Sequence, residues 1–275
     1  MKIIDTHTHL NVEPLLSSID EVISRAKEVG VEKVINNADS IESFSVLEDL
    51  SLRYKDFCYQ AIGLFPLERK DFEKDMSALR NALRNNHNVV ALGEVGLDYH
   101  YEKDEESKRE QKKYFEAQID IAKEFNLPLI IHSREADEDT FNILMNSGFE
   151  NNITLHCYSG SKEMALRYIK NHKNTFFGIG GVVTFSSARR LVEVVKEVPL
   201  SNLLLETDAP YLTPSPFRGK TNEPSYLTYV IKKIAEIKEL SEEEVAETLY
   251  QNAKRVYNLW ADTYLFAKAT ATFLS

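Results

Sequence analysis

The stretch VVALGEVGLDYHYEKDEESKREQKKYFEAQIDIAKEFNLPLIIH, residues 89–132, reads as a strand, a helix and a second strand. Both predicted strands, Val89–Glu94 and Leu127–His132, are short and apolar on both faces, as strands of a helix-covered parallel sheet are. Between them, Tyr114–Phe125 carries apolar residues at helical spacing, and Pro128 stands where that helix should already have ended. The stretch therefore predicts a β-α-β unit.

The same alternation continues along the 275 residues. Six further strands are predicted at Lys2–His7, Lys33–Asn36, Phe57–Gly63, Ile153–His156, Thr175–Ile179 and Leu203–Thr207. Helical patterns cover Ser77–Arg84, Leu191–Val198 and Tyr226–Ile237. Another helix is expected to open with a capping box of Ser18 and Glu21 and to stop at Gly30, and a last one to begin at Ser241.

Eight strand-then-helix units without a Gly/Ser linker favour an α/β fold of the (β/α)8 TIM-barrel type, for which ~250 residues is usual. A doubly wound open sheet is the main alternative. We expect residues 1–260 to form a single barrel domain. The mildly apolar residues 261–275 fit no unit and are interpreted as a C-terminal extension without an assigned role.

Composition limits the classes of partner. The net charge of −10 argues against a broad basic surface that grips long nucleic acid, although a local cleft with bound divalent metal could still admit it. The opening residues MKIIDTHTHL carry no apolar segment or cleavage site of a secretory signal, so we expect none, and no run of ~20 apolar residues occurs in the sequence. We expect a cytoplasmic monomer that does not enter a membrane. The two cysteines, Cys58 and Cys157, are interpreted as core residues.

The strongest functional signal is the position of six metal-type side chains at the ends of predicted strands. They are His7, His9, Glu94, His132, His156 and Asp208. The carboxyl ends of barrel strands converge on one face, where active sites are built. Asp5 shares strand parity with His7 and could orient a ligand from behind.

Each residue alone has a simpler explanation. A lone histidine is more often a satisfied core or surface residue, Glu94 could pair with a cation, and Asp208 could cap a turn. A joint site is nevertheless favoured, because all six residues fall at predicted strand ends, whereas His87, His100 and His172 do not.

Imidazole and carboxylate suit Zn²⁺ or Mn²⁺, and carboxylate-rich sites also suit Mg²⁺. Six ligands are too many for one tetrahedral ion with an open position, so we expect two divalent ions. Glu94 is the candidate bridge, since its two oxygens can serve different ions. Asp208 would bind one ion and accept a proton from the attacking water, which makes Glu94 and Asp208 the predicted catalytic residues.

Six ordered segments resemble the TatD family of metal-dependent deoxyribonucleases, within the amidohydrolase-like barrels. They are DTHTHL at 5–10, ALGEVGLDY at 91–99, LPLIIHSRE at 127–135, TLHCYSG at 154–160, LLETDAPYL at 204–212 and RGKTNEP at 218–224. The likeness runs from residue 2 to about Leu259. Six segments in order are specific, whereas any one alone would be weak.

The resemblance implies how the ligands divide. His7, His9, Glu94 and Asp208 would hold one ion, and Glu94, His132 and His156 the other. It also implies Mg²⁺- or Mn²⁺-supported cleavage of DNA, often from the 3′ end of single strands. Family members have also been linked to removal of D-amino acids from tRNA.

Candidate substrate contacts lie near these segments. Arg218 and Lys220 could meet a phosphate, unless they form a solvated ion pair with Glu223, and Arg134 is a similar candidate. Tyr99 and, with it, Tyr158 could offer stacking faces for a base.

Two positions depart from the family pattern. Phe65 precedes Pro66 where relatives usually have histidine, and Thr221 stands where they usually have arginine. The first removes a polar group near the site, and the second removes a positive charge from the cleft.

Three functions remain open. A nuclease acting on DNA is favoured. A D-aminoacyl-tRNA deacylase or small-molecule ester or amide hydrolase would use the same metal site, because barrel and metals do not choose between P–O and C–O bonds. A metal-stabilised binding module without activity is the third, and the intact ligand set argues against it.

Overall fold

The computed structural model describes residues 1–86 and 88–260, so His87 and the extension expected at 261–275 lie outside it. One sheet of eight parallel strands follows the chain order. The strands are β1 (Ile3–Thr8), β2 (Val31–Asn37), β3 (Cys58–Ile62), β4 (Val89–Asp98), β5 (Leu129–Arg134), β6 (Ile153–Leu155), β7 (Thr175–Ile179) and β8 (Leu203–Leu205). All eight predicted strands are therefore confirmed in existence and order.

The sheet closes between its first and last strands. Just beyond β8, Asp208 donates its N–H to the carbonyl of His7 at 2.9 Å. His9 in turn donates to Ala209 at 2.8 Å, and Thr8 pairs with Ala209 in a parallel bridge. These contacts make a (β/α)8 barrel and exclude the open doubly wound sheet.

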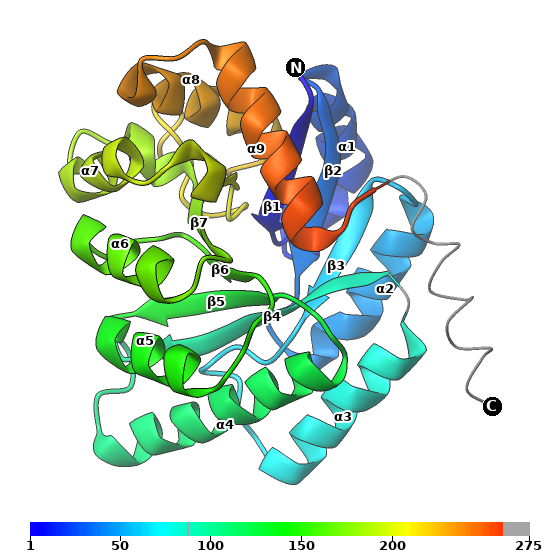
Figure 1. Cartoon of the computed structure of the whole chain (residues 1–275). Helices are drawn as coiled ribbons and strands as arrows, with labels where there is room; N and C mark the ends of the chain where they lie inside the picture. The colour runs from blue at the N-terminus through cyan, green and yellow to red at the C-terminus, as the bar shows by residue number, and fades with distance from the viewer. Residues whose placement is uncertain (87, 261–275) are drawn as a thin grey trace.

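Helices surround the strands (Figure 1). They are α1 (Ile19–Glu28), α2 (Phe44–Arg53), α3 (Phe72–Asn85), α4 (Glu105–Glu124), α5 (Asp137–Asn146), α6 (Lys162–Asn171), α7 (Arg189–Glu197), α8 (Leu227–Lys238) and α9 (Glu242–Tyr257). Short 3₁₀ turns occupy Leu16–Ser18, Ile41–Ser43, Gly181–Thr184, Leu200–Asn202 and Pro224–Tyr226. None of the helices described is both long and apolar enough to span a membrane.

Some expected boundaries need correction. Strand β4 continues four residues past Glu94, because its pairing with β5 resumes after a register shift between Leu92 and Val95. The capping box at Ser18 is absent, since this hydroxyl donates to the Pro14 carbonyl and caps no N–H group. The start at Ser241 is confirmed by its hydrogen bond from the Glu244 N–H.

Two apolar layers form the core. Alternate strand residues such as Ile4, Ile35 and Leu204 meet inside the barrel, where α9 contributes Tyr257. Their neighbours in sequence face outward and pack under the surrounding helices, where Cys58 lies as predicted. The Tyr257 hydroxyl and the Thr154 hydroxyl, 2.8 Å apart, tie α9 to β6. The alternation explains why the strands read as apolar on both faces.

Asn252 of α9 tests this attachment. Its amide donates to the carbonyls of Leu200 and Leu203 at 2.8 and 2.9 Å, and the residue is buried. Asn252→Ala should lower the free energy of unfolding by about 1–3 kcal/mol, because two buried carbonyls lose a donor. Urea unfolding followed by circular dichroism measures the change. The exposed neighbour Gln251→Ala should stay within about 0.5 kcal/mol, and equal losses would contradict this role.

Candidate metal centre

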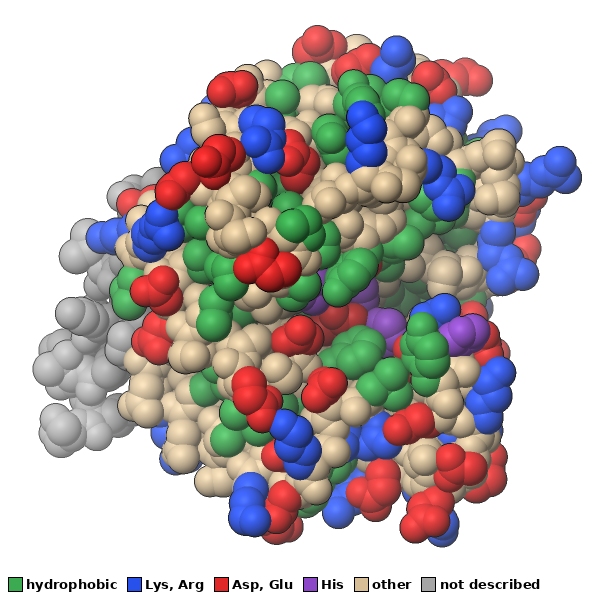
Figure 2. All heavy atoms as spheres, turned by 180° about the vertical axis from the view of Figure 1, so that it is seen from behind, with side chains coloured by type: hydrophobic (Ala, Val, Ile, Leu, Met, Phe, Trp, Pro, Cys, Tyr) green, Lys and Arg blue, Asp and Glu red, His purple; other side chains and the backbone are tan. Residues whose placement is uncertain are grey.

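The six predicted ligands come together at the carboxyl ends of the strands. β1 supplies His7 and, just beyond it, His9, while β4 and β5 supply Glu94 and His132. His156 and Asp208 follow β6 and β8. Figure 2 shows histidine and acidic side chains in a hollow of the surface, with hydrophobic side chains around it.

Glu94 lies at the centre of the cluster and divides it. Its Oε1 atom is 2.8 Å from His132 Nδ1 and 2.7 Å from His156 Nε2. Its Oε2 atom faces the other pair, at 3.4 Å from His7 Nε2 and 3.7 Å from His9 Nε2. Each carboxylate oxygen therefore serves its own pair of imidazoles, which is the arrangement of a bridging carboxylate.

Asp208 joins the first of these pairs. Its Oδ1 atom is 3.4 Å from His9 Nε2 and 3.7 Å from His7 Nε2, and the two Nε2 atoms are 3.2 Å apart. The backbone of Asp208 adopts a left-handed conformation with φ of 56°, in the turn after β8. Two compact groups of donor atoms result, each within 4.8 Å: one is His7, His9 and Glu94, with Asp208 beside its two imidazoles, and the other is Glu94, His132 and His156.

Hydrogen bonds behind two rings show that these nitrogens suit a cation. His9 Nδ1 lies 3.0 Å from the carbonyl of Asn37, which can only accept, so Nδ1 carries the proton. His132 Nε2 lies 3.1 Å from Asp98 Oδ2, which likewise leaves Nδ1 to face Glu94. The other nitrogen of each ring faces the carboxylates and is the one that could bind a cation once its proton is lost, as in histidine ligands of metals.

The protonation of these rings supports the same conclusion. Burial lowers the pKa of His9, but the hydrogen bond and charge of Asp208 outweigh it and raise the pKa to about 9. At His132, burial is likewise overcome by hydrogen bonds to Asp98 and Glu94, and the pKa again rises to about 9. Without metal the cluster therefore holds protons among its carboxylates, and divalent cations would replace them.

Asp5 was expected to orient a ligand side chain, but it forms its hydrogen bonds with backbone N–H groups and with the Thr207 hydroxyl. Its carboxylate accepts from the N–H groups of His7 and Thr207 and, at 2.6 Å, from the Thr207 hydroxyl. Asn222 donates to the carbonyls of Thr207 and Tyr211 and fixes the following turn. Together these bonds set the two chain segments that carry His7 and Asp208.

From the sequence, Asp98 was overlooked as a neighbour of the site and Cys157 was misplaced. Asp98 was missed because strand β4 was ended at Glu94; in the longer strand the two residues share parity. Cys157 was expected in the core, but it is partly exposed, and its sulfur lies within 4.8 Å of ligand atoms of His156 and Asp208. Its positive φ of 43° turns the side chain away from the direction that strand parity gives.

The predicted aromatic contacts are wrong. Tyr99 is 8% exposed and donates its hydroxyl to Asp139, and Tyr158 is 7% exposed and donates to the Ser161 carbonyl. Neither ring offers an open face for a base. Tyr211 is instead 54% exposed, and its ring centre lies 6.3 Å from that of His9.

The predicted cations are exposed. Arg134 lies over the ring of Tyr101, and Arg218 lies 4.0 Å from the ring centre of Phe185. The expected alternative, an ion pair of Arg218 or Lys220 with Glu223, is not formed, because Glu223 pairs with Arg25 at 2.6 Å.

Phe65, the departure in the third-strand segment, packs edge-on against His132 with ring centres 4.8 Å apart. An apolar ring thus forms this wall of the site.

Known proteins resemble the chain over nearly its whole length. The sequence model of the TatD related DNase family matches residues 4–258. YabD of Bacillus subtilis, named an uncharacterized metal-dependent hydrolase, is 44% identical over 93% of this chain and 98% of its own. TatD of Mycobacterium tuberculosis, also named an uncharacterized metal-dependent hydrolase, is 34% identical over 93% and 98%.

Among solved structures, YJJV of Escherichia coli K12, described as a TatD homolog, superposes with a TM-score of 0.86. It is 30% identical, and the match covers 93% of this chain and 98% of that one.

Metal binding should increase the thermal stability of the protein. Adding Mn²⁺ or Zn²⁺ to chelator-stripped protein should raise its melting temperature, since an ion at 100 times its Kd adds about 2.7 kcal/mol. Glu94→Ala should abolish most of the rise, because both groups of donors lose an oxygen. Asp139→Asn, a carboxylate paired with Lys112 outside the cluster, should keep it. Calorimetry of the wild type and both variants measures this rise in melting temperature. An undiminished rise in Glu94→Ala would rule out Glu94 as a ligand shared by the two ions.

Proposed function

The chain belongs to the TatD related DNase family of metal-dependent hydrolases, and we propose that it cleaves phosphodiester bonds of DNA, acting on the 3′ ends of single strands. The observation that carries the proposal is the division of Glu94 between two groups of ligand atoms. Two-ion sites of this kind suit displacement at phosphorus, because both the attacking and the leaving oxygen can be stabilised.

The proposed ligand sets follow the contacts. His7, His9, Glu94 and Asp208 would hold one ion, and Glu94, His132 and His156 would hold the other. When bound, the two divalent cations, Mg²⁺, Mn²⁺ or Zn²⁺, neutralise charge on the phosphate and make water more acidic.

Asp208 is the proposed proton acceptor. Its side chain is 14% exposed, against 5% for Glu94, so it reaches the solvent side of the cluster. Burial raises the pKa of Asp208, but the hydrogen bond to His9 and the charges of the histidines outweigh it and leave the pKa below its ordinary value. The carboxylate is therefore ionised and ready to take a proton from the attacking water.

Exposed groups on the surrounding loops would position the nucleic acid. Arg218 and Lys220 form no ion pair with any residue in the described part of the chain, so both are free to meet phosphate. Arg134 could do so from the end of β5. Tyr211, rather than Tyr99, is the exposed ring beside the ligands and is proposed as the stacking face.

A second candidate uses the same centre on a carboxylic ester or amide, including D-aminoacyl-tRNA. Phe65 favours it, because an apolar wall against His132 suits an uncharged acyl group better than a phosphate. The nuclease remains preferred over small neutral esters and amides, since exposed Arg218 and Lys220 would have no function toward them. An aminoacyl-tRNA is anionic and would use both cations as DNA would, so only the cleavage assay separates these two substrates.

The direct test is cleavage of a 5′-labelled single-stranded oligonucleotide by chelator-stripped protein with Mg²⁺, Mn²⁺ or Zn²⁺ restored separately. Cleavage should require metal, and stepwise shortening from the 3′ end should appear on a gel. Asp208→Asn should slow it about 10²–10⁴-fold, because the base is lost. If metal binds but no oligonucleotide is cut, the nuclease proposal fails and esters and aminoacyl-tRNA become the substrates to test.

Arg218 should contribute to substrate binding and not to the chemical step. Arg218→Ala should raise KM with little change in kcat, and should reduce the slope of log KM against log salt by about 0.7, the value for one phosphate contact on a single strand. Lys173→Ala provides a control, because this exposed lysine precedes β7, at the opposite end of the barrel. Steady-state rates at several salt concentrations measure both. Equal slopes for Arg218→Ala and wild type would exclude a phosphate contact.

A further inference from the structure

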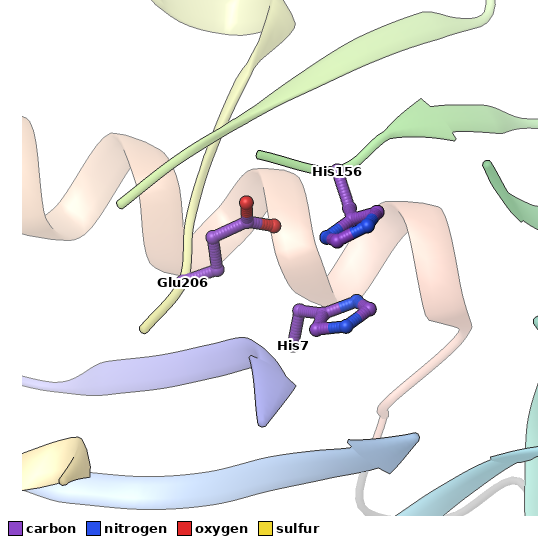
Figure 3. Close-up of side chains that lie close together, drawn as sticks. All are labelled: His7, His156 and Glu206. Atoms are coloured by element: carbon purple, nitrogen blue, oxygen red, sulfur yellow. The ribbon is translucent and has the colours of Figure 1, made fainter. Parts of the chain in front are cut away.

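Glu206 is a buried carboxylate that the proposed chemistry does not use. It follows β8 directly, is 0% exposed, and points into the barrel toward His7 and His156 (Figure 3). One carboxylate oxygen of Glu206 and one nitrogen of each ring lie within 4.8 Å of one another. The carboxylate therefore lies beside one histidine from each proposed metal-binding group.

Each of these three neighbouring side chains has a buried polar atom without a partner. Among the residues that the structure describes, His7 Nδ1, His156 Nδ1 and Glu206 Oε2 form no hydrogen bond. Buried polar groups are almost always paired, so three unpaired atoms in one place need a reason. Two potential donors and one acceptor complement each other.

The Nε2 atom of each ring already has neighbours in the ligand cluster. His156 Nε2 lies 2.7 Å from Glu94, and His7 Nε2 faces Glu94 and His9. The two rings are stacked, with centres 3.9 Å apart and planes 10° from parallel. If Nε2 of each ring binds an ion, Nδ1 must carry the proton, and it needs an acceptor behind the site.

Two features of the barrel fix the position of the Glu206 carboxylate. Its Oε1 atom accepts from the Cys157 N–H at 2.5 Å, which leaves Oε2 free. The space for the carboxylate comes from Gly178 on β7, where a Cβ atom would lie 2.0 Å from Oε2. Glycine is required here for room, because any side chain would displace the carboxylate.

We propose that Glu206 is a positioning residue that accepts hydrogen bonds from Nδ1–H of both His7 and His156, directly or through one bridging water, when Nε2 of each binds metal. It thereby fixes the tautomer and orientation of one ligand in each metal-binding group and links the two groups from behind. The inference rests on the two-ion site proposed above, but not on DNA as the substrate.

The test is metal affinity and histidine tautomer in Glu206→Gln, which keeps the shape but places an amide N–H opposite the rings. Competition with a chelator should show Zn²⁺ binding weakened about 10–100-fold at both sites. In Zn²⁺-loaded protein with ¹⁵N-labelled histidine, the Nδ1–H signals of His7 and His156 should shift or exchange away. Gly178→Ala should weaken Zn²⁺ binding in the same direction, because it displaces the carboxylate without changing charge.

A control separates this role from stability alone. Asp75→Asn alters a buried carboxylate that accepts from Tyr114 and from backbone N–H groups, so it should destabilise the metal-free protein yet keep Zn²⁺ affinity and both signals. Unchanged affinity and signals in Glu206→Gln would overturn the proposal. Three ions in wild type and two in Glu206→Gln would also overturn it, by making Glu206 a ligand. Failure of wild type to bind two ions would instead refute the underlying metal site.

Discussion

The position of Glu94 is the constraint on which the site depends. A carboxylate whose side chain is 5% exposed must be compensated, because an unpaired buried charge costs several kcal/mol. Compensation comes from four imidazoles that belong to three other strands, and these strands meet only because the barrel closes through the backbone of His7 and Asp208. The closure of the sheet and the assembly of the ligands therefore depend on the same backbone contacts.

Much of this could be predicted from sequence, for a simple geometric reason. Parallel strands of a closed barrel place their carboxyl ends on one face, so residues such as His132 and His156 could be brought together without knowledge of any contact. The apolar runs located those strand ends to within a few residues. Which oxygen of Glu94 serves which pair could not be predicted, because it depends on the register shift inside β4.

Side-chain directions and burial beyond the strand ends could not be predicted from the strand pattern. Parity of side chains holds only while the backbone stays extended, and Cys157 and Asp208 both have positive φ, which redirects their side chains. Burial of Tyr99 depends on α4 and α5, which supply Lys108 over its ring and Asp139 for its hydroxyl. Sequence spacing carries no information about such contacts between elements.

Electrostatics connects the buried cluster with the substrate. The whole chain carries a net charge of −10. Glu94 and Asp208 contribute two negative charges to the cluster, and without metal the protonated rings of His9 and His132 offset them. Two divalent ions would contribute four positive charges, so metal binding makes the field in the hollow more positive. An acidic protein can then attract an anionic backbone locally, and a few exposed cations suffice to orient it. Under the proposed function, the metal centre would contribute more to the affinity for nucleic acid than the outer surface does.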